Sequence, residues 1–276
     1  MSTLYLVATP IGNLADITLR AIEILKNVSL IAAEDTRVTQ KLLNHYHIHN
    51  RLISLYDQNE SRRIPILLEA LQKGDVALVS DSGTPGLNDP GFELVNAAIA
   101  SGHRISPIPG PCAPIAALVA SGLPTDHFLY LGFLPRKINE RKQTLEKIIS
   151  LPYTLVILEA PHRLLKTLTF LYQILGNRKL VIARELTKLY EEFWRGDLAQ
   201  AVDTFSAEAP RGEITLLIEG APQSPQLWDE ARLLEAIRLH LKAGTNLKAL
   251  ANLLAGESGW QSREIYRRAI KLKSNS

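Results

Sequence analysis

Short apolar runs alternate with helically spaced apolar residues along roughly the first 220 positions of the chain. Runs rich in Val, Ile and Leu predict buried strands, and apolar residues three or four apart predict amphipathic helices. Strands are expected at 4–8, 29–33, 52–55, 76–79, 103–108, 128–133, 154–158, 180–183 and 214–219, with a strand or turn at 193–197. Helices are expected at 18–26, 38–46, 59–73, 92–101 and 115–121, with another ending at Leu175. In the first helix, Leu19, Ile22 and Leu25 should share one face. This alternation predicts an α/β fold.

The stretch from Val76 to Gly91 is the most informative part of the pattern. A buried strand is followed at once by three glycines, two prolines and aspartates that include Asp81. Loops at the carboxyl ends of strands bind ligands in open α/β sheets, and glycine lets the backbone approach a ligand closely. These residues alone leave two interpretations open, a ligand-binding loop or a long surface turn.

Other strand ends carry similar loops. Residues 9–16 form a Pro/Gly loop after the first strand, and residues 109–114 form another before a helix of small residues, where backbone N–H groups can bind a polar ligand. Glu34–Arg37 suits either a site or a helix start capped by Asp35 or Thr36. Cys112 is either a nucleophile or, as its surroundings favour, a small buried loop residue.

Composition narrows the class of protein. The 276 residues suffice for one large or two medium domains. A single cysteine excludes an intramolecular disulfide, and no apolar run is long enough to span a membrane, so we expect a cytoplasmic protein. His45, His47 and His49 alternate in a polar connector, and no metal site is expected there.

The C-terminal segment carries the positive charge. Residues 228–276 have a net charge of +4, against +3 for the whole chain, which indicates an anionic partner such as nucleic acid. Helices are expected at 228–242, 247–254 and 262–272 after a Pro-rich linker at 221–225. They form either a helix-turn-helix-like module or a small helical cap. The basic segment 134–147 is either a solvated helix face or a phosphate-contacting patch.

Several motifs, taken together, closely resemble the tetrapyrrole-methylase-like methyltransferases, and among them the branch that acts on ribosomal RNA. The resemblance covers essentially the whole chain. It rests on residues 9–18, 33–37, 80–85, 109–111, 159–163 and 184–188. One departure is Ser82, which stands where the tetrapyrrole enzymes have the proline of a Gly-Asp-Pro loop.

The resemblance implies two α/β domains of the class III methyltransferase type with a cofactor cleft between them. The expected limits are an N-terminal domain 1–121, a second domain 122–222 after a hinge, and a C-terminal helical module 226–276. It also implies a homodimer that uses S-adenosylmethionine. The implied cofactor-binding residues are Pro10, Ser80, Asp81, Thr84, Cys112, Ala113, Glu159 and Leu186, with Asp81 orienting the cofactor's polar end.

The implied reaction is 2′-O-methylation of a cytidine ribose in the decoding region of 16S ribosomal RNA, in the assembled small ribosomal subunit. A ribose hydroxyl is a poor nucleophile, so a base or a cation should assist. The candidate proton acceptors are Asp35 and Glu159, with Arg37 organising a phosphate or substrate oxygen. The candidate RNA-binding residues are Arg136, Lys137, Arg141, Arg163, Arg263, Arg267 and Arg268. The alternatives are a tetrapyrrole C-methyltransferase and a non-enzymatic nucleic-acid-binding regulator.

Overall fold

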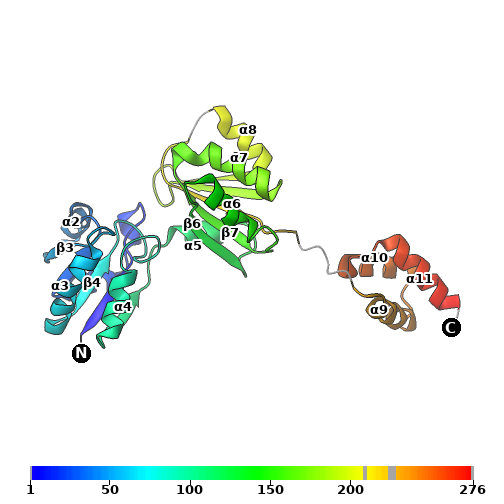
Figure 1. The fold of residues 1–276 in the computed structure, drawn as a ribbon, viewed down its shortest axis with the longest axis horizontal. Helices are drawn as coiled ribbons and strands as arrows, with labels where there is room; N and C mark the ends of the chain where they lie inside the picture. The colour runs from blue at the N-terminus through cyan, green and yellow to red at the C-terminus, as the bar shows by residue number, and fades with distance from the viewer. Residues whose placement is uncertain (1, 208–209, 223–227, 275–276) are drawn as a thin grey trace. The chain divides into compact units, whose positions relative to one another are not determined.

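The structure of the protein is a computed structural model that describes residues 2–207, 210–222 and 228–274. It divides into two compact units, residues 1–220 and 221–276 (Figure 1). The first unit contains two five-stranded sheets with their helices, and the second contains helices. In the described part of the chain, no helix is long and apolar enough to cross a membrane.

The first sheet is parallel, with strand order β3-β2-β4-β1-β5. Its strands are β1 (Thr3–Val7), β2 (Leu30–Ala33), β3 (Leu52–Ser54), β4 (Val76–Val79) and β5 (Arg104–Ile108). The connecting helices are α1 (Leu19–Asn27), α2 (Thr36–His45), α3 (Glu60–Lys73) and α4 (Phe92–Ala100). Alternate residues of the central strand β4 face opposite sides, so Ala77 packs with α1 and α2 while Leu78 packs with α3 and α4. Because β4, β1 and β5 are neighbouring parallel strands, their carboxyl ends lie side by side at one edge of the sheet.

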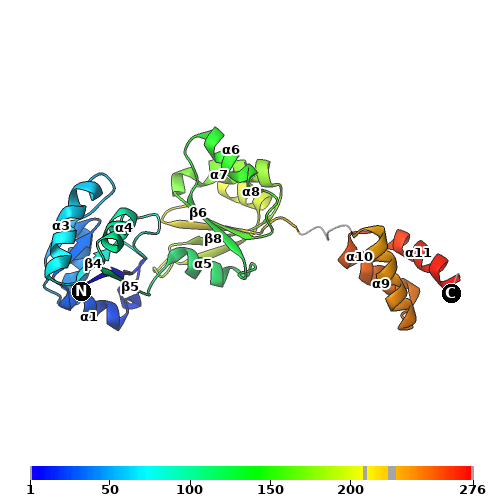
Figure 2. The same ribbon diagram turned by 60° about the horizontal axis from the view of Figure 1, so that its bottom comes forward.

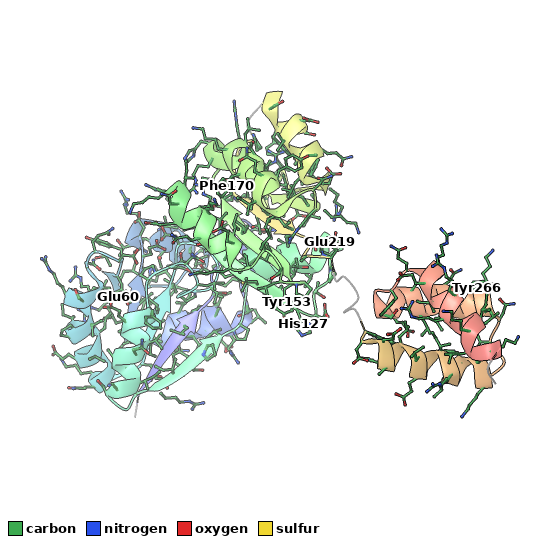
Figure 3. The ribbon with its side chains drawn as sticks, turned by 45° about the vertical axis from the view of Figure 1, so that its right-hand side comes forward. Glu60, His127, Tyr153, Phe170, Glu219 and Tyr266 are labelled. Carbon is green, nitrogen blue, oxygen red and sulfur yellow. The ribbon has the colours of Figure 1, made fainter. Side chains whose placement is uncertain are left out.

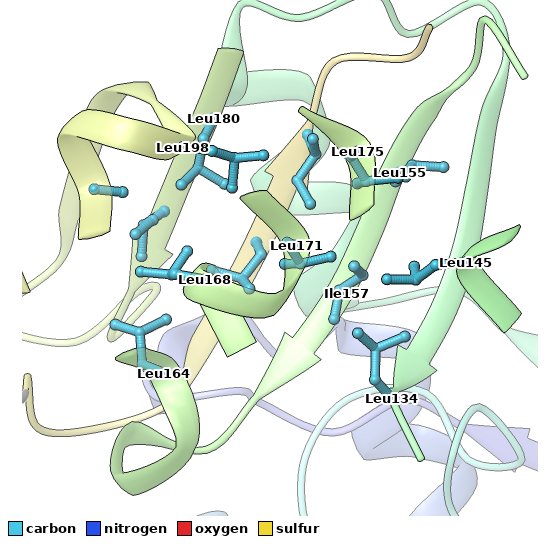
Figure 4. Packing of buried hydrophobic residues seen from close by; sticks show 14 of the residues in the cluster. Leu134, Leu145, Leu155, Ile157, Leu164, Leu168, Leu171, Leu175, Leu180 and Leu198 are labelled. Carbon is cyan, nitrogen blue, oxygen red and sulfur yellow. The ribbon is translucent and has the colours of Figure 1, made fainter. Parts of the chain in front are cut away.

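The second sheet is mixed, with order β6-β7-β10-β8-β9. Its strands are β6 (Phe128–Phe133), β7 (Thr154–Glu159), β8 (Lys179–Arg184), β9 (Glu192–Asp197) and β10 (Ile214–Ile218). The helices α6 (Ile138–Glu146), α7 (Leu164–Leu175) and α8 (Leu198–Ala207) belong to this part of the chain. The Leu- and Ile-rich faces of α7 and the sheet form its main core, in which Leu168, Leu171 and Ile157 are fully buried (Figure 4).

Helix α5 (Ala113–Ser121) follows the first sheet in sequence but packs on the second, against β7, β8 and β10. It lies on the opposite face of that sheet from α7 and α8 (Figure 2). Its residues Ala117 and Leu118 share a core with Ile11, which follows β1. This core joins the two sheets into one unit. The expected domain limits stay predictions, and α5 contacts the second sheet although it lies within the expected N-terminal domain.

The second unit is a bundle of α9 (Glu230–Lys242), α10 (Leu247–Ser258) and α11 (Ser262–Ser274) around a Leu- and Ile-rich core. Two tryptophans of this unit make a hydrogen bond and cation–π contacts. The indole Nε1 of Trp260 donates to the Trp228 carbonyl at 2.6 Å, and the guanidinium groups of Arg232 and Arg268 each lie 4.4 Å from a tryptophan ring centroid. Three packed helices are the arrangement expected for this segment.

The predicted α/β class is confirmed, and the differences are local. Helix α8 has no counterpart among the expected elements, and α10 continues through Gly256 to Ser258 instead of ending at residue 254. A helix interior tolerates a glycine at a cost of about 1 kcal/mol, which packing of the helix offsets. Leu19, expected on one face with Leu25, is 81% exposed, and Ala21 is buried instead. Two short 3-10 helices, Leu14–Asp16 and Pro161–Arg163, were also not expected. Part of the predicted linker, residues 223–225, lies outside the described residues.

Candidate functional site

The three Pro/Gly loops predicted from the sequence meet at the carboxyl edge of the first sheet. The Thr9 N–H donates to the Gly83 carbonyl at 2.9 Å, and the Gly83 N–H donates back to the Thr9 carbonyl at 3.0 Å. The Thr84 hydroxyl donates to the Pro111 carbonyl at 3.1 Å. These bonds join the loops after β1, β4 and β5, because the three strands are neighbours in the sheet. Gly83 has a φ of 82°, a left-handed conformation that glycine adopts without strain.

The far end of the loop after β4 is also anchored. Glu60 of α3, which is labelled in Figure 3, is only 7% exposed, and its carboxylate accepts the Leu94 N–H of α4 at 3.1 Å. Residues 80–91 are thus held at both ends. The loop in the stretch from Val76 to Gly91 is therefore held in place by hydrogen bonds, as a ligand-binding loop requires.

A cavity of about 390 Å³ opens beside this loop. It draws residues from the loop after β4, the start of α5, β6 and the ends of β7 and β10. The lining is Ile11, Ser82, Gly83, Thr84, Leu87, Asn88, Asp89, Cys112, Ala113, Pro114, Tyr130, Phe133, Leu158, Glu159, Ala160, Pro161, Gly212, Glu213, Ile214 and Thr215. Its size suits a small molecule or cofactor. Of the residues expected to bind the cofactor, Thr84, Cys112, Ala113 and Glu159 line it.

The other four expected cofactor residues lie outside the lining. The buried Ser80 hydroxyl donates within its own loop, to the Gly83 carbonyl at 3.3 Å. Asp81 accepts the Asp35 N–H at 2.9 Å, which joins the loops after β2 and β4. Leu186 packs in the core that joins the sheets, and Pro10 is half-buried. In this structure Ser80, Asp81 and Leu186 hold the loops that surround the cavity.

The loop after β8 is strained. Glu185 and Thr187 have φ values of 50° and 64°, and such values are uncommon for non-glycine residues, above all for a β-branched one. Gly12 lies so close that a Cβ there would be 2.4 Å from Lys188 Cγ. Among the described side chains, the buried Thr187 hydroxyl has no hydrogen-bond partner. Strain of this kind costs about 1–3 kcal/mol and occurs mostly at functional sites, which supports a role for this loop beside the cavity.

The cavity region is acidic. Burial raises the pKa of Glu34 and of Asp81, and the neighbouring carboxyl groups raise them further. Burial, followed by the charge of Glu34, raises the pKa of Asp89 to about 6. Among the described residues that line the cavity there is no Lys or Arg. Two of its carboxyl groups are paired with cations from outside the lining, Glu159 with Arg163 and Glu213 with Lys188.

Asp89 was not among the residues proposed from the sequence. It stands in Asn-Asp-Pro-Gly, where every residue type favours turns, and this composition concealed its role. The available signal was its place in the same loop as Asp81. Only the fold shows that the chain turns back and brings Asp89 to the cavity.

The two proposed proton acceptors have their oxygens engaged. Asp35 caps α2, accepting the Arg37 N–H at 2.8 Å, and pairs with the Arg37 guanidinium at 2.6 Å. These contacts with Arg37 lower the pKa of Asp35 to about 2. Glu159 is 2% exposed and accepts from the Thr167 hydroxyl at 2.5 Å, while Arg163 lies 3.2 Å from its other oxygen. Both carboxylates are therefore engaged within the protein, and their roles as proton acceptors stay hypotheses.

The candidate RNA-binding residues divide into two groups. Arg136, Lys137, Arg263 and Arg267 are exposed. The other three are engaged inside the protein. Arg141 is buried and donates to the Pro135 carbonyl, Arg163 pairs with Glu159, and Arg268 stacks on Trp260. The structure therefore does not present the Arg141 guanidinium to RNA as expected, because α6 turns that side chain toward Phe170.

Comparison with known proteins shows close relatives over the whole chain. The family described as Tetrapyrrole (Corrin/Porphyrin) Methylases matches residues 3–202. A protein of Synechocystis sp. named ribosomal RNA small subunit methyltransferase I is 46% identical over 278 residues, covering 100% of both chains. The protein of the same name from Escherichia coli O157:H7 is 44% identical, covering 97% of this chain and 94% of the relative.

Solved structures share the fold at lower identity. The uroporphyrin-III C-methyltransferase of Thermus thermophilus, solved as a complex with S-adenosyl homocysteine, superimposes with a TM-score of 0.55 at 20% identity. The match covers 78% of this chain and 97% of that one. It supports the assignment of the fold.

Proposed function

The chain belongs to the tetrapyrrole methylases, in the branch of ribosomal RNA small subunit methyltransferase I, and on this premise we propose its reaction: methyl transfer from S-adenosylmethionine to the 2′-oxygen of a cytidine ribose in the decoding region of 16S ribosomal RNA. The membership confirms the predicted methyltransferase class, with S-adenosylmethionine as the methyl donor. The observation that carries the RNA substrate is the length of the match. The tetrapyrrole methylase family matches residues 3–202, whereas the ribosomal RNA relatives also match the C-terminal helical unit.

The cavity is the proposed cofactor site. Bound S-adenosylmethionine supplies an electrophilic methyl group on a positively charged sulfur. Thr84, Cys112 and Ala113 would contact it from the first sheet and α5, and Glu159 from β7. The protein's main contribution is positioning, because the transfer is an in-line displacement that needs donor and acceptor held together. Pro10, Ser80, Asp81 and Leu186 would support this site through the loops that they hold.

The catalytic roles of Asp35, Arg37 and Glu159 stay hypotheses, and the geometry does not favour them. Asp35 and Arg37 pair with each other outside the cavity lining. Glu159 lines the cavity, but Thr167 and Arg163 engage its oxygens. A role for Glu159 in shaping the cavity accords better with these contacts.

The RNA would contact exposed basic side chains on both units. Arg136 and Lys137 precede α6, and Arg263 and Arg267 lie on α11. Sequence-specific RNA recognition targets unstacked nucleotides in loops, so a folded context such as the assembled small subunit is the proposed substrate. The proposed location is the cytoplasm, where ribosomal subunits are available.

The proposed oligomeric state is a homodimer. Large apolar side chains stand exposed around the loop after β8 and on α5: Leu189 is 88% exposed, Tyr190 72% and Val119 70%. Large apolar side chains that are exposed to this degree are candidates for a protein interface. Analytical ultracentrifugation should give twice the mass of one chain, and a monomer at micromolar concentration would contradict the dimer.

Three substrates separate the proposed function from its alternatives. The protein is incubated with methyl-labelled S-adenosylmethionine and small ribosomal subunits, naked 16S ribosomal RNA, or a porphyrinoid. We expect label in the RNA of the subunits. Label in the porphyrinoid would indicate a tetrapyrrole methyltransferase, and binding to RNA with no transfer to any substrate would indicate a regulator.

A further inference from the structure

Among the described residues that line the cavity, three carry a carboxyl group: Asp89, Glu159 and Glu213. Glu159 is ion-paired with Arg163 at 3.2 Å, and Glu213 lies 3.6 Å from the Lys188 ammonium. None of the ion pairs found among the described residues includes Asp89. Asp89 is thus the carboxyl group of the lining that is not neutralised by a cation.

The segment that carries Asp89 is fixed by a contact across the cavity. The Tyr130 hydroxyl of β6 donates to Asn88 Oδ1 at 2.6 Å. The Asn88 amide sits against Gly132, where a Cβ would lie 2.4 Å from Asn88 Nδ2. Gly132 coincides with the irregular register between β6 and β7, so the bulge makes room for the amide. We call this the Asn88 contact. It joins the loop after β4 to the second sheet, one residue before Asp89.

Several titratable groups surround Asp89. Glu34, Asp57 and Asp81 follow β2, β3 and β4, and their negative charges raise the pKa of its carboxyl, while the neighbouring Ser80 side chain acts on that pKa in the opposite direction. On the other side of the cavity, Tyr130 and Cys112 interact with each other, and the charge of Asp89 acts on Tyr130. Burial raises the pKa of Tyr130 to about 12, so its hydroxyl remains a donor. Burial and the like charges hold the pKa of Asp89 near 6, close to the value that suits a general base at neutral pH.

We propose that Asp89 accepts the proton of the methyl-accepting ribose hydroxyl and that the Asn88 contact positions it. This inference rests on the proposed function. In the step, the 2′-O–H bond breaks and its proton passes to the Asp89 carboxylate. The oxygen lone pair forms a C–O bond to the methyl carbon while the C–S bond breaks, and its electron pair stays on sulfur as the neutral thioether.

The test is single-turnover methylation of small ribosomal subunits across pH 5 to 9, with S-adenosylmethionine affinity measured in parallel. The wild-type rate should rise with pH and level off above about pH 6. Asp89→Asn should lower the rate by about 100-fold or more at pH 7.5 and remove that inflection, with cofactor affinity changed by less than about threefold. Asp89→Glu, which keeps a carboxyl group, should recover part of the rate. Tyr130→Phe should lower the rate by about tenfold, because it removes the hydrogen bond that orients Asn88.

The matched control is Asp203→Asn on α8, an exposed aspartate outside the cavity lining, which should leave rate and profile unchanged. An Asp89→Asn rate within about threefold of wild type, or an unchanged inflection, would overturn the proposal. Parallel loss of rate and cofactor affinity would also overturn it and assign Asp89 to cofactor binding. A wild-type protein inactive on subunits would instead refute the proposed function.

Discussion

At the scale of single residues, local contacts distinguish the candidate carboxyl groups from one another. Asp35, Glu159 and Asp89 all follow buried strands or lie in the loops after them, and from the sequence the first two are the natural candidates. The structure engages Asp35 with Arg37 and Glu159 with Thr167. Spacing along the chain cannot show this, because Thr167 approaches Glu159 only after α7 has folded back on β7.

The environment of Asp89 has a consequence for stability. Its pKa is about 6 in the folded protein and 3.8 in the absence of such surroundings. A raised carboxyl pKa means that the folded state loses stability as the pH rises from 3.8 to 6 and stays less stable above that range. Solvent screens the charge of a carboxyl group that is only partly buried. We therefore expect the free energy of unfolding to fall by about 1 kcal/mol.

Asp89→Asn should therefore stabilise the protein at neutral pH while it lowers activity. We expect the melting temperature to rise by about 2 °C at pH 7.5 and to change little at pH 3.5, where Asp89 is protonated in the folded protein and mostly protonated in the unfolded chain. Calorimetry at the two pH values measures the difference. An equal rise in melting temperature at both pH values would mean that the charge of Asp89 does not cause the stabilisation.

At the scale of elements, the strand and loop pattern was predictable and the packing partners were not. Buried runs such as β4 and β10 are short, apolar and bounded by turn residues, so their sequence is sufficient to locate them. Helix α8 was missed, and α5 was found without the knowledge that it packs on the second sheet. Which sheet a helix covers depends on long-range packing that no local pattern contains. Here Leu118 of α5 shares one core with Val181 and Leu217 of the second sheet.

The candidate site shows the same division. The loops after β1, β4 and β5 were predicted correctly as strand-end loops because their Gly and Pro content is local information. The family resemblance assigned Thr84, Cys112, Ala113 and Glu159 to one cofactor site. The four residues line one cavity, and their contact with the cofactor stays a prediction. The Asn88 contact could not be foreseen, since it joins a loop and a strand 42 residues apart.

The Asn88 contact makes a prediction for the glycine beneath it. Gly132→Ala places a Cβ against the Asn88 amide and should destabilise the protein by about 1–3 kcal/mol, with reduced methylation. Gly102→Ala is the matched control, because Gly102 also has a positive φ but a Cβ there would meet nothing within 4 Å. Urea unfolding of the two variants isolates the cost of the clash. Equal decreases in the free energy of unfolding would show that the positive φ alone, and not the contact with Asn88, accounts for the destabilisation.

At the scale of the whole molecule, the chain combines a unit that contains the cavity with a basic helical unit. The cavity and every expected cofactor residue lie in residues 1–220, and the positive excess lies in residues 228–276. We therefore predict that the first unit binds the cofactor and that the second unit supplies much of the affinity for RNA.

Deletion of residues 225–276 tests this prediction. RNA affinity should fall by about tenfold or more and depend less steeply on salt, while S-adenosylmethionine affinity stays the same. In the full-length protein, Arg263→Gln with Arg267→Gln should weaken RNA binding in the same direction, and Glu264→Gln on the same helix should not. Unchanged RNA binding by the truncated protein would contradict a role for the second unit.

The most direct measurement concerns the position of the transferred methyl group. Alkali cleaves RNA only where a free 2′-hydroxyl can attack the adjacent phosphate, so a 2′-O-methylated nucleotide survives within a dinucleotide. After labelling of small subunits and alkaline hydrolysis of their 16S ribosomal RNA, the account predicts label in one dinucleotide that begins with 2′-O-methylcytidine. Label recovered in mononucleotides, which would place the methyl group on a base, or no label in the RNA, would contradict it.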